Sequence, residues 1–228
     1  MQKNKIFKKK FGKIDLIIDN RKSWIWKYFK KIRIKILKQY SYKFNVYKKQ
    51  EEIRKGEVLF ILGCDRVIPQ SVLRKHKNNI VIHESDLPKG RGWSPVTWQV
   101  ERGKNNIIFT LFEAARKVDA GDYYFKSILS LNGTELIEEI RKKVTDKISE
   151  MIVYYLEHYP MNPKKQKGKV TYFRRRQSND CKFDINKPVK SQFNRLRVVD
   201  NERYPAYFCY KNNKYIVKIY KTKNDESR

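Results

Sequence analysis

The stretch "GEVLFILGCDRVIPQSVLRKHKNNIVIHES", residues 56–85, contains two apolar runs joined by a short polar segment. The first run, residues 56–64, is almost continuously apolar, which is typical of a strand covered on both faces of a parallel sheet. Residues 68–76 could form a crossover helix, and residues 78–85 read as the next strand. The stretch therefore predicts two neighbouring strands of an α/β sheet.

Similar elements flank this stretch on both sides. Apolar or alternating runs predict strands at residues 13–19, 40–47, 105–114 and 122–131. Ile25, Phe29, Ile32 and Ile36 recur at helical spacing, although residues 31–37 also alternate like a strand. A short helix is expected at residues 94–102, and a long one from an N-cap at Thr134 to Pro160. Strands alternating with helices indicate an α/β fold, Rossmann-like, with a mostly parallel sheet.

The last part of the chain is more polar. The segment "MNPKKQKGK", residues 161–169, interrupts the pattern and predicts a boundary between a domain at 1–160 and a C-terminal segment at 161–228. That segment contains the basic cluster "YFRRRQ" and an alternating run at 214–220, which the turn sequence "KNNK" precedes. We expect a short α+β appendage here.

Composition limits the class of protein. The 228 residues suit one domain with a modest appendage, and no apolar run approaches the roughly 18 residues that span a bilayer. The Lys-rich start lacks a signal peptide's apolar core, so a cytoplasmic location is expected. Cys64, Cys181 and Cys209 lack the spacing of a zinc site, and no metal is predicted. The net charge of +29 fits either a polyanion-binding surface or a genome biased towards A and T.

His83 ends a predicted strand, where ligands of parallel sheets bind. The loop after it, "LPKGRGWSP", has two prolines and two glycines, and such backbone can approach a ligand closely. Asp119 and Asp122 flank Gly121 before a later strand, so one of them could form a proton-handling pair with His83. The alternatives are a histidine bonded to backbone and two ordinary turn residues.

The order of these motifs resembles the folate-dependent formyltransferases, which include methionyl-tRNA, glycinamide ribonucleotide and amino-sugar formyltransferases. The family pattern has Asn-x-His-x-Ser, then Leu-Pro, a glycine-bearing loop and a later Asp before Gly. The positions that fit are His83, Ser85, Leu87, Pro88, Gly92, Asp119 and Gly121, within residues 56–135. One position departs: Val81 stands where the family has its catalytic Asn. Asn79 lies about 7 Å further along a strand, too far to substitute, so Ser85 or a backbone N–H could contribute instead.

The resemblance implies a sheet of the formyltransferase type and formyl-tetrahydrofolate as cofactor. It assigns His83 as donor or proton relay and Asp119 as the residue that orients it and receives a proton. The loop "LGCDRVIP" resembles the family's folate-binding loop, and residues 114–118 match the loop that lines the pteridine pocket. The implied cofactor-binding residues are Cys64, Arg66, Ile68, Ala114 and Val118.

The tail resembles that of the formyltransferases acting on nucleotide-linked amino sugars, especially the pseudaminic acid pathway enzyme. The substrate it implies is a UDP-linked 4-amino-4,6-dideoxy sugar for surface polysaccharide or glycan synthesis, with residues 161–228 closing over it. Arginines can hold a diphosphate, and aromatic rings can cover a base or sugar. The implied acceptor-site residues are Trp93, Arg174, Arg175, Asn194, Arg197 and Tyr204.

Two other functions stay open. The segment after residue 160 is too short for the additional β-barrel domain of the tRNA formyltransferases, but a tRNA formyltransferase-like role is an alternative. Val81 and the charge also fit a catalytically inactive protein that binds nucleic acid or a membrane surface. A basic surface could also hold an enzyme near an anionic membrane. The family resemblance implies a homodimer, although no apolar stripe assigns an interface.

Overall fold

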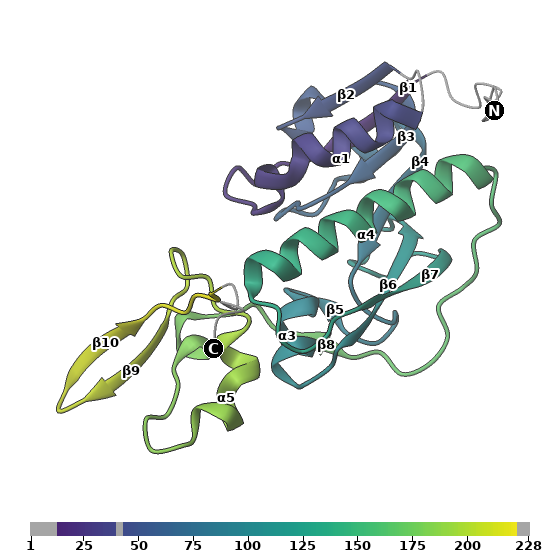
Figure 1. Cartoon of the computed structure of the whole chain (residues 1–228). Helices are drawn as coiled ribbons and strands as arrows, with labels where there is room; N and C mark the ends of the chain where they lie inside the picture. The colour runs from purple at the N-terminus through teal and green to yellow at the C-terminus, as the bar shows by residue number, and fades with distance from the viewer. Residues whose placement is uncertain (1–12, 40–42, 223–228) are drawn as a thin grey trace, which may run out of the picture.

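A computed structural model describes residues 13–39 and 43–222 and contains a central sheet of six strands (Figure 1). The strand order is β2-β1-β3-β4-β6-β7, and the first four strands run parallel. Strand β6 is antiparallel to both of its neighbours. The predicted α/β fold with a mostly parallel sheet is therefore confirmed. The strands are β1 (Lys13–Ile17), β2 (Lys43–Tyr47), β3 (Gly56–Ile61), β4 (His76–His83), β6 (Asn106–Glu113) and β7 (Tyr123–Ser130).

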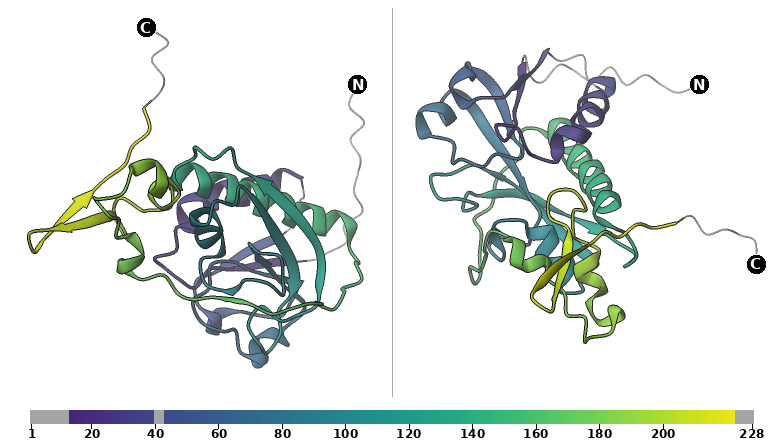
Figure 2. Two further views of the ribbon diagram at one scale, coloured as in Figure 1. Left: turned by 90° about the horizontal axis from the view of Figure 1, so that it is seen from below. Right: turned by 90° about the vertical axis from the view of Figure 1, so that its left-hand side faces the viewer.

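Two long helices, α1 (Ile25–Gln39) and α4 (Ile137–His158), lie side by side on one face of the sheet (Figures 1 and 2). Alternate strand residues point to opposite faces. Phe60 and Ile82 accordingly belong to the large core beneath these helices, whereas Ile61 and Val81 belong to a smaller core on the opposite face. The helix predicted from the spacing of residues 25–36 is therefore confirmed, and the strand-like alternation within it does not form a strand.

The crossover between β3 and β4 is shorter than predicted. Only one turn, α2 (Gln70–Leu73), is helical, and β4 already begins at His76. The buried His76 ring lies with Nε2 2.8 Å from the Asp15 carboxylate, and His76 pairs in register with Gly56. A Cβ at Gly56 would lie 2.4 Å from His76 Nε2. These contacts fix His76 in the sheet, so the prediction of helix up to residue 76 was wrong.

Helix α4 begins at Ile137 rather than directly after Thr134. The carboxylate of Glu135 accepts hydrogen bonds from the backbone N–H groups of Asn132 and Gly133, at 2.8 and 3.1 Å. These bonds hold residues 132–135 in a turn, and Glu139 accepts from the Leu136 N–H at 2.9 Å at the true helix start. The predicted N-cap at Thr134 was therefore wrong. Glu135 binds backbone N–H groups of the turn before the helix, and Glu139 binds the backbone N–H at the helix start.

The C-terminal segment continues along the sheet before it forms its own elements. Lys164 exchanges backbone hydrogen bonds with Tyr123 at 2.7 and 2.8 Å. Strand β8 (Tyr172–Phe173) pairs with β5 (Arg91–Gly92) in the loop after His83. Residues 161–173 are thus attached to the core by backbone pairing. Beyond them follow a 3-10 turn (Ser178–Cys181), α5 (Val189–Leu196), β9 (Ala206–Tyr210) and β10 (Asn213–Val217).

Strands β9 and β10 form the hairpin that "KNNK" predicted, and the hairpin projects from the body of the molecule (Figure 1). Tyr210 pairs with Asn213, which leaves Lys211 and Asn212 as a two-residue turn with φ of 43° and 62°. Two positive φ values in succession are typical of the type I′ turn, which matches the twist of the flanking strands. The second strand ends at Val217, earlier than the predicted residue 220.

Arg197 anchors the C-terminal segment to the core. Its side chain is 1% exposed, and Nη2 lies 3.2 Å from the carboxylate of Glu135, whose side chain is 2% exposed. Its remaining N–H groups donate to the Glu135 carbonyl and to the side-chain oxygens of Asn105 and Asn194 at 3.0–3.2 Å. A buried charge pair with these additional hydrogen bonds is costly to break, because one partner is left unpaired.

Glu135 should make the stability of the fold depend on pH. Burial raises the pKa of its carboxyl group, but hydrogen bonds from Lys143 and from the Asn132 N–H outweigh burial and bring the pKa to about 2. A depressed folded-state pKa contributes stability above the unfolded value of about 4.3, and this stability is lost as pH falls towards 2.

We therefore expect the difference in unfolding free energy between the wild type and Glu135→Gln to be largest near pH 7 and to shrink between pH 4.5 and 3. Urea unfolding at several pH values measures this difference. A difference that does not change with pH would contradict the expectation.

None of the helices within residues 13–39 and 43–222 combines the length and apolar character needed to cross a bilayer.

Candidate functional site

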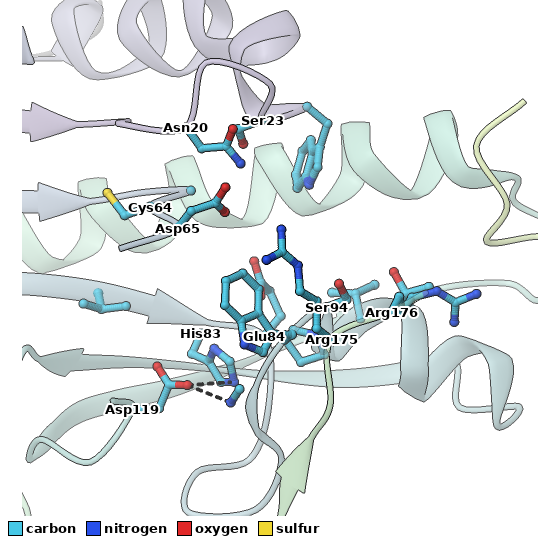
Figure 3. Close-up of a pocket in the computed structure, with 18 of the residues that line it drawn as sticks. Asn20, Ser23, Cys64, Asp65, His83, Glu84, Ser94, Asp119, Arg175 and Arg176 are labelled. Atoms are coloured by element: carbon cyan, nitrogen blue, oxygen red, sulfur yellow. Dashed lines mark hydrogen bonds and ion pairs between the residues drawn. The ribbon is translucent and has the colours of Figure 1, made fainter. Parts of the chain in front are cut away.

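A cavity of about 540 Å³ lies at the carboxyl ends of β1, β3 and β4 (Figure 3). Its walls come from both faces of the sheet. Ile61, Ile68 and Val81 line it from the smaller core, and Ile140 and Val144 of α4 line it from the larger one. We call these two parts the α2 side and the α4 side. The cavity therefore reaches both faces of the sheet at the carboxyl ends of the strands.

His83 stands at the end of β4, where the two sides meet, and is 7% exposed (Figure 3). Its Nε2 lies 2.8 Å from the carbonyl oxygen of Gly90. A carbonyl oxygen can only accept, so in this arrangement Nε2 carries the proton and Nδ1 is the free acceptor. Nε2 also lies 3.8 Å from Oδ2 of Asp119. The predicted pair is thus brought together, with backbone fixing the tautomer of the histidine.

Asp119 is held rigidly opposite His83. Its Oδ2 accepts the backbone N–H of Gly92 at 2.8 Å, and its own backbone has a φ of 53°. The side chain of Gln166 donates to the carbonyl oxygens of Asp119 and Gly121 at 3.0 and 2.8 Å. At Gly121 a Cβ would lie 1.7 Å from the Glu113 carbonyl oxygen, so only glycine fits. Of the two candidate aspartates, Asp119 lines the cavity and Asp122 does not.

The position two residues before His83 offers no hydrogen-bond donor. Val81 packs in the smaller core and lines the cavity with an apolar surface. Asn79 does not replace the missing amide, because its Nδ2 donates to the Leu73 carbonyl at 3.0 Å. The hydroxyl of Ser85 is buried and has no hydrogen-bond partner among the described residues, but Ser85 does not line the cavity.

All five residues expected at the cofactor line the cavity: Cys64, Arg66, Ile68, Ala114 and Val118. Burial raises the pKa of the Cys64 thiol to about 12, so it remains protonated and contributes as a small apolar group. The Arg66 side chain is 64% exposed at the rim, 3.8 Å from Asp19 and 3.7 Å from Glu51. This part of the wall is an apolar slot with a cation at its outer end.

The six residues expected at the acceptor separate into two groups. Trp93, Arg175 and Tyr204 line the cavity, and the Arg175 guanidinium lies 4.8 Å from the centre of the Trp93 ring. The other three make contacts within the protein and lie outside the cavity wall: Arg174 binds Asp180 and stacks on Trp98, Arg197 binds Glu135, and Asn194 accepts a hydrogen bond from Arg197.

Several cavity residues were not foreseen from the sequence. Arg141 of α4 lies 2.8 Å from Asp200 and within 5.8 Å of the Trp24 ring centre, and Arg203 donates to the Lys22 carbonyl at 2.6 Å. They come from distant parts of the chain. Glu84 also lines the cavity, and its place directly after His83 was the signal that could have revealed it.

Comparison with known proteins agrees with this architecture. Residues 18–156 match the sequence model of the family described as Formyl transferase. The methionyl-tRNA formyltransferase of Thermodesulfovibrio yellowstonii is 26% identical over 173 residues, which cover 73% of this chain and 54% of that protein. The chain spans about half the length of the curated relatives it matches.

Two solved structures of nearly the same extent share the fold. A methionyl-tRNA formyltransferase from Clostridium thermocellum has a TM-score of 0.76 at 24% identity, covering 94% of this chain and 95% of that one. A sugar N-formyltransferase from Shewanella sp. has a TM-score of 0.63 at 15% identity, covering 91% and 97%. At these identities the likeness establishes the fold alone.

Proposed function

Because the chain belongs to the formyl transferase family, we propose that it transfers a formyl group from formyl-tetrahydrofolate to the primary amine of a phosphate-bearing acceptor. One observation carries this proposal. His83 and Asp119, 3.8 Å apart, lie on the wall of a cavity that opens onto both faces of the sheet. Two substrates can therefore approach the same histidine from opposite sides, and their positioning supplies much of the rate.

The α2 side fits the folate. A flat heterocycle requires a narrow apolar slot, and Ile68, Val81 and Ala114 line one there. The carboxylates at the other end of a folate require a cation near solvent, and the exposed Arg66 lies at the rim, where they would compete with its long contacts to Asp19 and Glu51. When bound, the folate would supply an activated formyl group.

His83 and Asp119 would handle charge and protons. In formyl transfer, negative charge develops on the formyl oxygen and positive charge on the attacking nitrogen. With Nε2–H on the Gly90 carbonyl, the free Nδ1 of His83 can accept a proton and pass it on, and the Asp119 carboxylate stabilises the ring while it is positively charged. Since Gly92 fixes Asp119 and Gly90 fixes His83, little reorganisation is needed during the reaction.

For the acceptor we favour a nucleotide-linked amino sugar, with UDP-linked 4-amino-4,6-dideoxy sugars as the leading candidates. Arg175 has no carboxylate partner in the described structure and lies at the cavity wall, where it can bind a diphosphate. Trp93 and Tyr204 offer ring surfaces for a base or sugar.

A methionyl-tRNA acceptor is the second candidate. The curated relatives cited above are methionyl-tRNA formyltransferases, and the net charge of +29 favours binding of a large polyanion. The two candidates differ in how salt should act. Binding of tRNA through many phosphates weakens steeply with salt, whereas binding of one diphosphate weakens only slightly.

A direct competition between acceptors tests the assignment. Purified protein with labelled formyl-tetrahydrofolate would receive UDP-linked 4-amino sugars and methionyl-tRNA, singly and together, at low and moderate salt. We expect a larger kcat/KM for a nucleotide-linked sugar, with little effect of salt. A larger value for methionyl-tRNA that falls steeply with salt would replace the sugar assignment by the tRNA one.

The adjacent arginines Arg174 and Arg175 offer a matched pair of variants. We expect Arg175→Ala to raise KM for the acceptor about 10-fold or more with a small change in kcat, because a charge-assisted hydrogen bond contributes about 1.5–3 kcal/mol. Arg174→Ala should leave KM unchanged, since Arg174 is bound to Asp180 outside the cavity wall. Initial-rate measurements decide this, and equal effects of the two variants would contradict it.

A further inference from the structure

Glu84 places a carboxyl group on the cavity wall beside His83, in addition to that of Asp119. It follows the last residue of β4, and Figure 3 shows it next to His83 at the strand end. Ile82 points into the core beneath α4, whereas Val81 points to the opposite core. Continuing this alternation one residue past β4 puts Glu84 on the α4 side, opposite the proposed folate slot.

The carboxylate of Glu84 makes no hydrogen bond or ion pair to another side chain within residues 13–39 and 43–222. Its backbone carbonyl accepts a hydrogen bond from Nε2 of Gln99 at 2.7 Å, and its carboxylate is bonded within the residue to its own backbone N–H. Asp119 differs, because the Gly92 N–H already occupies one of its oxygens. A partly buried carboxylate without a partner in another residue is costly unless a ligand supplies one. The ligand that would complement it is a cation or a hydrogen-bond donor.

Burial, more than the neighbouring charges, suits Glu84 to accept a proton. Burial raises the pKa of Glu84, an effect that the His83 charge opposes and the Asp119 charge reinforces. A carboxylate with a raised pKa is a stronger base near neutral pH. The other charged side chains on the α4 side of the cavity are Lys22, Arg141, Arg175, Arg176, Asp200 and Arg203.

Four of these other groups are already engaged with the protein. Arg141 and Asp200 form an ion pair with each other, Arg176 binds Glu101 and Arg203 donates to the Lys22 carbonyl. Among the cavity-lining carboxylates, those of Glu84 and Asp65 form no ion pair with another side chain in the described part of the chain, and of these two only Glu84 adjoins His83.

We propose that Glu84 binds the amino group of the acceptor and removes its proton, so that the neutral amine reaches the formyl carbon beside His83. This inference rests on the proposed function. The acceptor enters as an ammonium ion, and one N–H proton passes to the Glu84 carboxylate. The nitrogen lone pair then forms the new C–N bond, while the bond from the formyl carbon to the donor nitrogen breaks. A second proton from the acceptor nitrogen passes through His83 to the departing donor nitrogen.

The division of roles follows from the faces of the sheet. His83 can reach the formyl group from the junction, but its Nε2 proton is engaged by Gly90 and Asp119 lies behind it. His83 and Asp119 do not point to the α4 side, which is the part of the cavity proposed for the acceptor. Glu84 thus makes the site selective for acceptors that carry a protonated amine.

The test compares Glu84→Gln, which keeps the size and removes the charge, with Glu84→Asp, which keeps the charge, in the full chain. We expect Glu84→Gln to lower kcat/KM for the acceptor by about 10²-fold to 10³-fold at pH 7.5. Glu84→Asp should retain part of the activity. Binding of 5-formyl-tetrahydrofolate, followed by fluorescence, should change less than about twofold in both variants, because the folate slot lies on the other side.

The pH profile gives a readout that a merely structural role would not produce. Activity that needs ionised Glu84 falls as pH decreases through its raised pKa, so kcat/KM of the wild type should have an acidic limb that Glu84→Gln lacks. If Glu84→Gln keeps the wild-type rate and acidic limb while His83→Ala is inactive, the Glu84 inference fails and formyl transfer stands. If the wild type transfers no formyl group to any amine, the proposed function fails, and this inference with it.

Discussion

Replacing His83 with alanine is expected to lower kcat/KM for formyl transfer by about 10³-fold. The substitution removes the proton relay, and a positioned acid–base group contributes typically 10²-fold to 10⁴-fold. Val81 cannot compensate, since it presents only an apolar side chain to the cavity. Steady-state release of tetrahydrofolate measures the loss.

The chain supplies its own control for this experiment. His158 lies exposed near the end of α4, where it stacks on Tyr154, and it does not line the cavity. His158→Ala should therefore have wild-type kinetics. If His83→Ala keeps more than about one tenth of the wild-type kcat/KM, the assignment of His83 as the proton-handling residue is wrong.

The second large effect concerns stability. We expect Arg197→Met to lower the free energy of unfolding by about 3 kcal/mol, because it removes one of the two cationic partners of the buried Glu135 carboxylate and the donor to the Glu135 carbonyl. The cost should lie at the lower end of the range for broken buried pairs, since Lys143 still contacts Glu135 at 2.6 Å. Urea unfolding followed by circular dichroism measures it.

Arg195→Met is the matched control for this prediction. Arg195 is 37% exposed, and its partner Glu101 keeps a second contact at 2.6 Å with Arg176. An exposed pair contributes about 0–1 kcal/mol, so the control should lose little stability. Equal losses in the two variants would show that Arg197 does not anchor the C-terminal segment.

The sequence predicted the sheet well because its strands carry a strong local signal. Continuous apolar runs such as residues 56–64 can be buried on both faces only in a covered sheet, and β3 forms there. One error arose where a distant contact decides the local structure: His76 is held in β4 by Asp15 of β1. The other arose from competing local bonds, because Glu135 binds the backbone N–H groups of Asn132 and Gly133 and ends a turn where a helix was expected to start.

The sequence predicted part of the candidate site, because some of its residues lie in recognisable short motifs. His83 and Asp119 stand in short motifs with glycines that fix the backbone, so their pairing follows from sequence order. Arg174 and Arg175 lie in no such motif. The sequence does not distinguish Arg175, at the cavity, from its neighbour Arg174, which is bound to Asp180. Which arginine is free depends on the path of residues 171–181 around α3 (Pro95–Glu101).

The most direct test of the central claim is a single-turnover measurement of formyl transfer. Wild-type protein in excess would be mixed with formyl-labelled formyl-tetrahydrofolate and a UDP-linked 4-amino sugar, and the label followed by chromatography. We expect the label to move to the sugar as an acid-stable formamide, with an equal amount of tetrahydrofolate released. His83→Ala should form neither product. Label that remains on the folate, with every amine offered and at protein concentrations where folate binding is saturated, would contradict this expectation.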